Sequence, residues 1–194
     1  MIDKKDITGI ILAGGKSSRM GKEKGLINFN GKPFVQYIIS ALRPLVSKTL
    51  IISGNSDYDV FKLERFEDII KDAGPLAGIY TGLIQSKTDF NLVLSCDIPL
   101  IRTEVLELLI KAQDGKSDVF QIVGNGKHMP LIALYHRRCE RIFYELLQND
   151  ERRLYVALNQ CKVKNVVLNS EKDLLTTNIN TPEELKTIAH GSNN

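Results

Sequence analysis

Strand-like and helix-like segments alternate along almost the whole of this 194-residue chain. Short apolar runs, several of them rich in β-branched residues, predict strands at 7–12, 49–53, 68–71 (the weakest), 92–95, 119–123, 131–135 and 163–168. Helical spacing of apolar residues predicts helices at 33–45, 76–85, 103–112, 138–148 and 182–189. Continuous apolar strands that alternate with helices are buried on both faces. We therefore predict an α/β fold of three layers, with a mostly parallel sheet covered by helices on both faces.

The turn after the first strand is the first place to look for a site, because such folds bind ligands at the carboxyl ends of their strands. There the chain reads LAGGKSSRMGKEK over residues 12–24, a basic segment that contains glycines. Backbone N–H groups and positive side chains gathered in one place suit the phosphates of a nucleoside triphosphate. Two familiar phosphate loops do not fit, since the P-loop needs glycine at Ile10 and the dinucleotide fingerprint needs glycine at Lys16. An ordinary charged surface turn is the alternative that this segment leaves open by itself.

Composition narrows the class of protein. Hydrophobic residues make up 43% of the chain and charged residues 25%, which is typical of a globular protein and excludes fibrous and disordered classes. The net charge of +3 is small, and the basic residues are interspersed with acidic ones, so no nucleic-acid partner is expected. Without an internal repeat or linker, we expect one domain over 1–194, with a frayed tail at 190–194.

The cysteines and the apolar runs bear on the compartment. Three cysteines without a CxxC pair predict reduced thiols rather than a disulfide framework or a zinc site. No run approaches the roughly 20 apolar residues of a membrane helix, and the first residues lack an apolar signal core. We expect a cytoplasmic protein with no membrane partner.

The segment at 12–24 resembles the loop LAGGxSxRMGxxK of the nucleotidyltransferases, and most closely that of the molybdenum cofactor guanylyltransferases. The resemblance continues through DAGPLAG at 72–78, CDIPL at 96–100 and NINTPEEL at 178–185, and it covers almost the whole chain. It implies a Rossmann-like nucleotidyltransferase domain. It also implies an activity, in which GMP passes from Mg-bound GTP to the terminal phosphate of molybdopterin and pyrophosphate is released.

The same resemblance implies roles for the residues of the loop. The nucleotide would contact Leu12, Ala13, Gly14 and Gly15, while Arg19 and Lys24 would serve as catalytic groups on the triphosphate. Arginine offers a planar fork to two phosphate oxygens, whereas lysine brings a compact charge that suits a departing pyrophosphate. The loop of this chain has Glu23 before the lysine, where the family often has aspartate.

Asp97 is the candidate metal ligand and the third candidate catalytic residue. It follows the apolar strand predicted at 92–95, at the edge where the glycine turn also lies. From local sequence alone, Asp97 is as well explained as the cap of a turn. The resemblance implies that it binds the nucleotide and holds Mg²⁺, with the amide oxygen of Asn180 as a second ligand. The alternative for Asn180 is a structural place before the capping box that starts at Thr181.

Two further residues are implied to contact the nucleotide. Asp72 would face the guanosine, since a carboxylate accepts well from the N1–H and N2–H₂ edge of guanine. Asn55 follows the strand predicted at 49–53 and would join in nucleotide recognition. An asparagine in a turn is more often structural, so that alternative also stays open.

The second substrate is less well marked in the sequence. Arg152 and Arg153 are candidates for its phosphate and His128 for another contact, with a solvated face and a satisfied loop histidine as the alternatives. Partner molybdoenzymes or proteins of cofactor biosynthesis are implied by the same resemblance. Two rival functions remain: a related nucleotidyltransferase that uses CTP or another phosphate acceptor, and a nucleotide-binding domain without catalysis.

Overall fold

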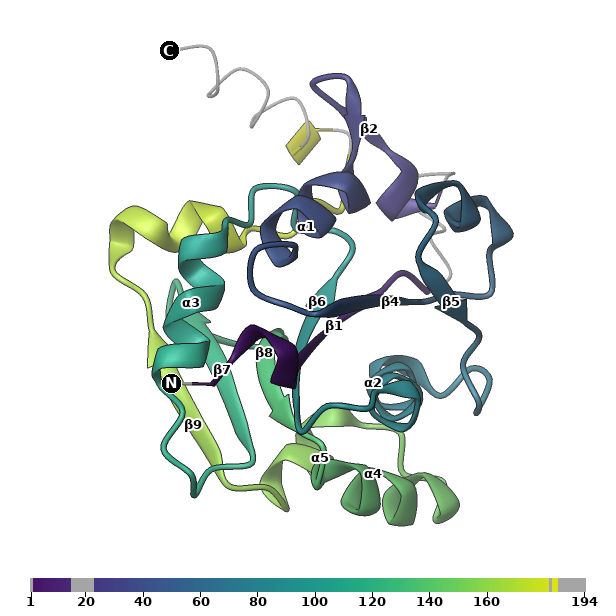
Figure 1. Ribbon diagram of the computed structural model, residues 1–194, viewed down its shortest axis with the longest axis vertical. Helices are drawn as coiled ribbons and strands as arrows, with labels where there is room; N and C mark the ends of the chain where they lie inside the picture. The colour runs from purple at the N-terminus through teal and green to yellow at the C-terminus, as the bar shows by residue number, and fades with distance from the viewer. Residues whose placement is uncertain (1, 15–22, 182, 185–194) are drawn as a thin grey trace.

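The computed structural model describes residues 2–14, 23–181 and 183–184. Its main strands are β1 (Ile7–Leu12), β4 (Lys48–Ile52), β5 (Glu64–Phe66), β6 (Phe90–Ser95), β7 (Val119–Gly124), β8 (Lys127–His136) and β9 (Val163–Val167). They form one seven-stranded sheet in the order β5-β4-β1-β6-β8-β7-β9 (Figure 1). Only β8 runs antiparallel to its neighbours, β6 and β7. The predicted α/β class and the mostly parallel sheet are confirmed.

Helices cover both faces of this sheet. They are α1 (Phe34–Leu42), α2 (Gly74–Gln85), α3 (Thr103–Lys111), α4 (Cys139–Gln148) and α5 (Leu154–Asn159). Residues of α1 and α3 share one apolar cluster with the sheet, and residues of α2, α4 and α5 share the other. Figure 1 shows α2, α4 and α5 together on one side of the sheet. This arrangement is the three-layer sandwich that the alternating sequence predicts.

Strand β1 shows why the sheet sits at the centre. All six of its residues are buried. Successive side chains of a strand point to opposite faces, and accordingly Ile11 packs into the cluster of α1 and α3 while Ile10 packs into that of α2 and α4. A strand that is apolar on both faces is stable only when helices cover both sides.

Helix α2 lies unusually close to β1, and a glycine allows this approach. A Cβ atom at Gly82 would lie 2.6 Å from Cγ2 of Ile10, closer than two carbon atoms can pack. Because the helix axis is held against the strand, the first turn of α2 lies at the carboxyl edge of the sheet, near the end of β1. The glycine thus helps to place one wall of the cavity that opens at this edge.

The structure corrects one predicted strand and adds elements that were not predicted. Residues 68–71 are not a strand; β5 lies just before them, and the Ile69 N–H instead donates to the Thr81 hydroxyl on α2 at 3.0 Å. The chain therefore turns toward α2 at this point rather than extending the sheet edge. Helix α5 and the hairpin of β2 (Asn28–Phe29) and β3 (Lys32–Pro33) are too short to show a periodic pattern in the sequence.

Four short 3-10 segments complete the described elements: η1 (Lys4–Asp6), η2 (Lys24–Leu26), η3 (Ser56–Phe61) and η4 (Ser170–Thr176). Of the helix predicted at 182–189, the two described residues, 183 and 184, are helical, and the predicted tail at 190–194 lies outside the described residues. All three cysteines are free thiols. Within the described part of the chain, every helix is too short or too polar to cross a membrane.

Candidate active site

A cavity of about 870 Å³ opens at the carboxyl edge of the sheet. Leu12, the last residue of β1, pairs in register with Ser95, the last residue of β6, so the segments that follow these two strands leave the sheet side by side. The Cys96 N–H donates to the Leu12 carbonyl at 3.1 Å and extends this pairing by one residue. The lining residues are Leu12, Gly14, Glu23, Lys24, Ile52, Asp68, Asp72, Gly74, Pro75, Gly78, Ser95, Cys96, Asp97 and Leu131.

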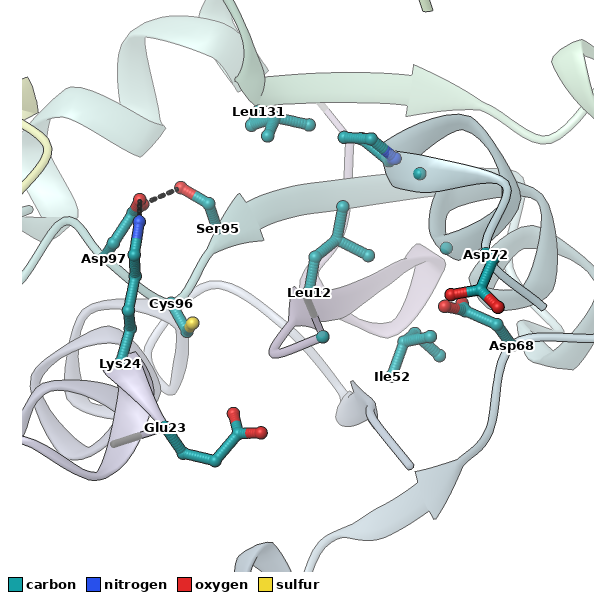
Figure 2. A pocket seen from close by; sticks show the side chains of 14 residues that line it. Leu12, Glu23, Lys24, Ile52, Asp68, Asp72, Ser95, Cys96, Asp97 and Leu131 are labelled. Atoms are coloured by element: carbon teal, nitrogen blue, oxygen red, sulfur yellow. Dashed lines mark hydrogen bonds and ion pairs between the residues drawn. The ribbon is translucent and has the colours of Figure 1, made fainter. Parts of the chain in front are cut away.

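At one end of the cavity, Asp97 is held by neighbours on both sides. The Ser95 hydroxyl donates to Asp97 Oδ1 at 2.7 Å, and the Lys24 ammonium lies 3.4 Å from Asp97 Oδ2. Figure 2 shows these three side chains converging at that end. The side chains of Asp97 and Lys24 are 13% and 27% exposed, so this ion pair is partly withdrawn from water.

Asn180 reaches the same end of the cavity from the far end of the sequence. The Ile179 N–H donates to the Asp97 carbonyl at 2.8 Å, and the fully buried Ile179 side chain packs with Phe29 and Phe34. With its neighbour anchored in this way, Asn180 accepts a 2.5 Å hydrogen bond from the Lys24 ammonium. Lys24, Asp97 and Asn180 therefore meet at one point.

The predicted capping box stabilises the segment that follows Asn180. The Glu184 N–H donates to the Thr181 hydroxyl at 3.2 Å, and the Thr181 N–H donates to the Glu184 carboxylate at 3.1 Å. Such reciprocal bonds satisfy free N–H groups at a helix start. The prediction of a capping box at Thr181 is confirmed.

The position of Lys24 depends on the packing of the residue that follows it. A Cβ atom at Gly25 would lie 2.5 Å from the phenolic oxygen of Tyr58 and 3.1 Å from Cβ of Cys96. Only glycine brings the backbone beside Lys24 this close to the buried Tyr58 ring. The Tyr58 hydroxyl also donates to the Glu23 carboxylate at 3.5 Å, and burial raises the pKa of both side chains.

Cys96 lies between these charged groups, and its thiol is buried. Its side chain is 8% exposed, and burial raises the pKa of its thiol to about 12. A thiol with this pKa stays protonated at neutral pH, whereas nucleophilic attack requires the thiolate. Transfer through a covalent cysteine intermediate is therefore disfavoured at this site.

The other end of the cavity carries two carboxylates, Asp68 and Asp72 (Figure 2). Asp68 Oδ1 is buried and has no hydrogen-bond partner within the described part of the chain, and burial raises the pKa of this carboxyl. The carboxylate fits between two glycines. A Cβ atom at Gly78 would lie 3.4 Å from Asp68 Oδ1, and one at Gly14 would lie 3.8 Å from Asp68 Oδ2.

Asp68 is the site residue that sequence reasoning missed. A buried oxygen without a partner costs free energy unless a donor reaches it, so Asp68 at the cavity wall is a candidate contact for the N–H groups of a ligand. A signal was available, because Asp68 follows the carboxyl end of β5 just as Asp97 follows that of β6. The misplaced strand at 68–71 hid it.

The structure brings together most of the predicted site residues. Leu12, Gly14, Lys24, Asp72 and Asp97 line the cavity. Ala13 is buried beside it, and its N–H is already bound by the Ile52 carbonyl at 2.9 Å. Gly15 and Arg19 lie outside the described residues, so their predicted roles stay predictions.

Asn55 does not line the cavity. Its side-chain oxygen accepts from the Asp57 N–H at 2.9 Å and caps η3. This is the structural role that the sequence leaves open for it. Its predicted contact with the nucleotide stays a prediction.

Of the residues predicted to meet the second substrate, Arg152 lies at the cavity rim, whereas Arg153 and His128 do not line the cavity. Arg152 reaches the Asp72 carbonyl at the cavity rim, with its guanidinium at 3.4 Å. Arg153 is bound by the Glu151 carboxylate at 2.8 Å. His128 is exposed and contacts Gln121 at 3.2 Å.

The Asp97 end offers the oxygen ligands that a divalent cation needs. No group of three or more His, Cys, Asp or Glu side chains that could hold a metal occurs among the described residues. Asp97 and Asn180 nevertheless direct a carboxylate oxygen and an amide oxygen at one cationic group, the Lys24 ammonium. Both are hard oxygen donors of the kind that Mg²⁺ prefers, so they fit a cation that takes its remaining ligands from phosphate and water.

A mostly parallel sheet with Gly14 after its first strand, and with a lysine and an aspartate at its carboxyl edge, is typical of a nucleotide-binding α/β protein. Residues 9–175 match the family described as the MobA-like NTP transferase domain. The chain belongs to this family, which is a family of nucleotidyltransferases.

Relatives that resemble this chain along nearly their whole length bear consistent names. It is 40% identical to the "probable molybdenum cofactor guanylyltransferase" of Flavobacterium johnsoniae, over 94% of this chain and 96% of that protein. It is 33% identical to the molybdenum cofactor guanylyltransferase of Vibrio campbellii, over 95% and 96%.

Solved structures agree on the fold. The molybdopterin-guanine dinucleotide biosynthesis protein A of Archaeoglobus fulgidus superposes with a TM-score of 0.80 at 22% identity, covering 96% of this chain and 98% of that one. A CMP:2-keto-3-deoxy-manno-octonic acid synthetase complexed with CTP superposes with a TM-score of 0.75 at 16% identity, covering 97% and 99%. The fold of this chain is therefore shared by proteins whose sequences differ widely from it.

Proposed function

We propose that this protein transfers GMP from Mg-bound GTP to the terminal phosphate of molybdopterin and releases pyrophosphate. The observation that carries this proposal is the cavity with two unlike ends. Lys24, Asp97 and Asn180 meet at one end. At the other lies Asp68, whose buried Oδ1 has no hydrogen-bond partner among the described residues. A nucleoside triphosphate has the same polarity, with anionic phosphates at one end and hydrogen-bond donors on its base at the other.

The phosphates belong at the Lys24 end. A lysine ammonium follows negative charge as a compact, mobile cation, and here it already lies between two oxygen ligands at the cavity wall. Asp97 and Asn180 would hold Mg²⁺, which when bound neutralises charge on the triphosphate and orients it. Arg19 and the backbone of Gly14 and Gly15 complete the proposed phosphate contacts.

The chain needs neither a general base nor a nucleophile of its own. The acceptor phosphate is already an anion at neutral pH and attacks the α-phosphorus directly. The new bond forms to that phosphorus, while the bond from it to the bridging oxygen of the leaving pyrophosphate breaks. Phosphoryl-type transfers of this kind depend on positioning and charge compensation, which a fixed lysine and a fixed carboxylate supply.

The base belongs at the Asp68 end, and the carboxylate there favours guanine. A carboxylate accepts from two neighbouring donors, and guanine presents N1–H and N2–H₂ side by side. Cytosine presents one amino group beside the acceptor N3, so the second carboxylate oxygen would face another acceptor. Asp72 lines the same end of the cavity and is proposed as a second contact to the guanosine.

CTP with a different acceptor is the second candidate, because the same fold occurs in a synthetase complexed with CTP. Calorimetric titration of the protein with GTP, CTP, ATP and UTP in the presence of Mg²⁺ distinguishes the two. We expect GTP to bind most tightly by at least about tenfold, the equivalent of one hydrogen-bonded donor to a charged group. Tighter binding of CTP would replace the proposal with the second candidate.

The activity is tested by pyrophosphate release from GTP with molybdopterin present and absent. We expect release that requires both the acceptor and a divalent cation. No release with any nucleotide and acceptor would instead support the rival hypothesis of a nucleotide-binding domain without catalysis. One domain over the whole chain, a cytoplasmic location and a handover of product to molybdoenzymes are further parts of this proposal. The seven-stranded sheet, which draws its strands from residues 7 to 167, supports the first of them.

A further inference from the structure

Ser95 is a polar residue at the end of β6, whose other polar residue, Asn91, lies near the start of the strand. Along β6 the side chains alternate between faces, and Ser95 falls on the face of Val93, which packs into the cluster of α2 and α4. It is 8% exposed and lines the cavity. The one hydrogen bond of its hydroxyl within the described residues is the 2.7 Å bond to Asp97 Oδ1.

This bond makes the two oxygens of Asp97 unequal. Oδ1 is engaged by the hydroxyl, while Oδ2 faces the Lys24 ammonium at 3.4 Å. The backbone of Asp97 is held as well, because its carbonyl accepts the 2.8 Å bond from the Ile179 N–H. The Ser95 bond therefore uses one lone pair of Oδ1 and holds the carboxylate in an orientation that leaves Oδ2 facing the Lys24 ammonium.

We propose that Ser95 is a positioning residue that keeps Asp97 a one-oxygen ligand and thereby favours Mg²⁺ over Ca²⁺. The inference rests on the proposed function, in which Asp97 holds the cation. Mg²⁺ demands a near-octahedral shell that takes one oxygen from each carboxylate, whereas Ca²⁺ accepts larger shells in which a carboxylate contributes both oxygens. A hydroxyl that donates to Oδ1 makes that oxygen a poorer second ligand for either ion, and the effect matters more for Ca²⁺.

The alternative is that Ser95 only stabilises the turn after β6. The two roles predict different effects of removing the hydroxyl. If the bond only stabilises the turn, loss of the hydroxyl lowers the stability of the fold and leaves the preference between cations unchanged. If the bond positions Asp97, loss of the hydroxyl changes that preference, because the freed carboxylate can bind the cation with both oxygens.

The test measures cation binding rather than turnover. The full chain is saturated with a GTP analogue that carries a methylene group between its α- and β-phosphorus atoms, so that no transfer takes place. Bound Mn²⁺ is followed by electron paramagnetic resonance, and Mg²⁺ and Ca²⁺ are added as competitors. Removal of a residue that hydrogen-bonds to a metal ligand typically lowers metal affinity about 10- to 100-fold. For Ser95→Ala we expect Mg²⁺ affinity to fall about tenfold and Ca²⁺ affinity by less than about threefold.

Matched variants distinguish the effect of losing the hydroxyl from the effect of changing the size of the side chain. Ser95→Cys keeps nearly the same volume with only a weak donor, so it should behave like Ser95→Ala even if the alanine variant folds poorly. Ser95→Thr keeps the hydroxyl and should retain the wild-type preference. Ser86→Ala is the control, because it removes another buried hydroxyl, one that bonds to Thr88 before β6 begins, far from the cavity.

The outcomes also separate this inference from the proposed function. If the wild type binds no divalent cation with the analogue, or if Asp97→Asn binds it as well as the wild type does, the metal assignment itself is wrong and the inference falls with it. If Asp97→Asn loses the cation while Ser95→Ala and Ser95→Cys keep the wild-type ratio of Mg²⁺ to Ca²⁺ affinity, only the role of Ser95 is overturned. A lower ratio in both variants, restored by threonine, supports it.

Discussion

The two ends of the cavity are built in opposite ways. At the Lys24 end, every polar side chain of the constellation has a partner: Ser95 and Lys24 bind Asp97, and Lys24 binds Asn180. At the Asp68 end, a carboxylate oxygen is buried without a partner among the described residues. The first end is therefore organised before any ligand binds, whereas at the second end Asp68 Oδ1 has no donor among the described residues. Preorganised charge is the usual property of a reacting centre, and an unsatisfied polar atom is the usual property of a recognition site.

Removal of Asp97 should have the largest effect. We expect Asp97→Ala to lower kcat for GMP transfer about 1000-fold, the loss typical of removing an electrostatic group from a reacting centre. The fold should persist, since the Lys24 ammonium keeps its bond to Asn180. Pyrophosphate release measures the first effect and thermal unfolding the second. Substantial transfer by a folded Asp97→Ala variant would show that the reacting centre is not at this end.

Asp68→Asn should affect recognition rather than turnover. We expect KM for GTP to rise about 10- to 100-fold, the range for one hydrogen bond to a charged group, with kcat little changed. The wild type should also discriminate GTP from inosine triphosphate, which lacks the N2 amino group, and the variant should not. Steady-state kinetics with the two nucleotides measures both effects, and an unchanged KM would contradict the assignment of the base to this end.

The same variant should be more stable than the wild type. Burial raises the pKa of Asp68 in the folded state, so the folded protein loses stability as the pH rises through that pKa. An asparagine carries no charge and avoids this loss. We expect Asp68→Asn to melt higher at neutral pH, with the difference disappearing at a pH low enough to protonate the carboxyl. A variant that binds GTP less well yet melts higher would identify Asp68 as a residue kept for function.

Alanine substitutions at Gly25 and Gly78 test how tightly the backbone is packed at the two ends of the cavity. The added Cβ of Gly25→Ala would lie 2.5 Å from the Tyr58 hydroxyl, and overpacking of this kind costs about 1–3 kcal/mol of unfolding free energy. The nearest contacts of Gly78→Ala would be 3.2 Å and 3.4 Å, and an alanine inside a helix recovers about 1 kcal/mol of helix propensity, so its net effect should be small. Urea unfolding measures both. Tyr58→Phe should partly rescue Gly25→Ala, since it removes the clashing oxygen; no rescue would contradict this explanation.

Asn55→Ala should have the smallest effect on activity. The asparagine caps η3 outside the cavity, and loss of such a cap costs about 1 kcal/mol. We expect a corresponding loss of stability in urea unfolding, with KM for GTP unchanged. A clear rise in KM would instead support the nucleotide contact implied by the family resemblance and would extend the recognition end of the cavity toward β4.

Short stretches of sequence were sufficient to predict those features that depend only on neighbouring residues. Neighbouring residues were enough to predict the first strand, the position of Asp97 after a strand and the capping box at Thr181. The prediction of a strand at 68–71 was wrong because two isoleucines in a turn look like an edge strand when only local sequence is considered. Asp68 was missed for the same reason. Its importance depends on Gly14 and Gly78, which approach it from two other elements.

The sequence by itself determined the layered α/β class and the kinds of side chain at the carboxyl edge, because strand periodicity, helix caps and turn chemistry act over a few residues. Only the tertiary structure decided which of these side chains meet. Lys24 and Asn180 are 156 residues apart, and Lys24 and Asp97 are 73 apart. Their contact depends on β6 pairing with β1 and on Ile179 packing beside it, and the order in which strands pair across a sheet is not written in any local pattern.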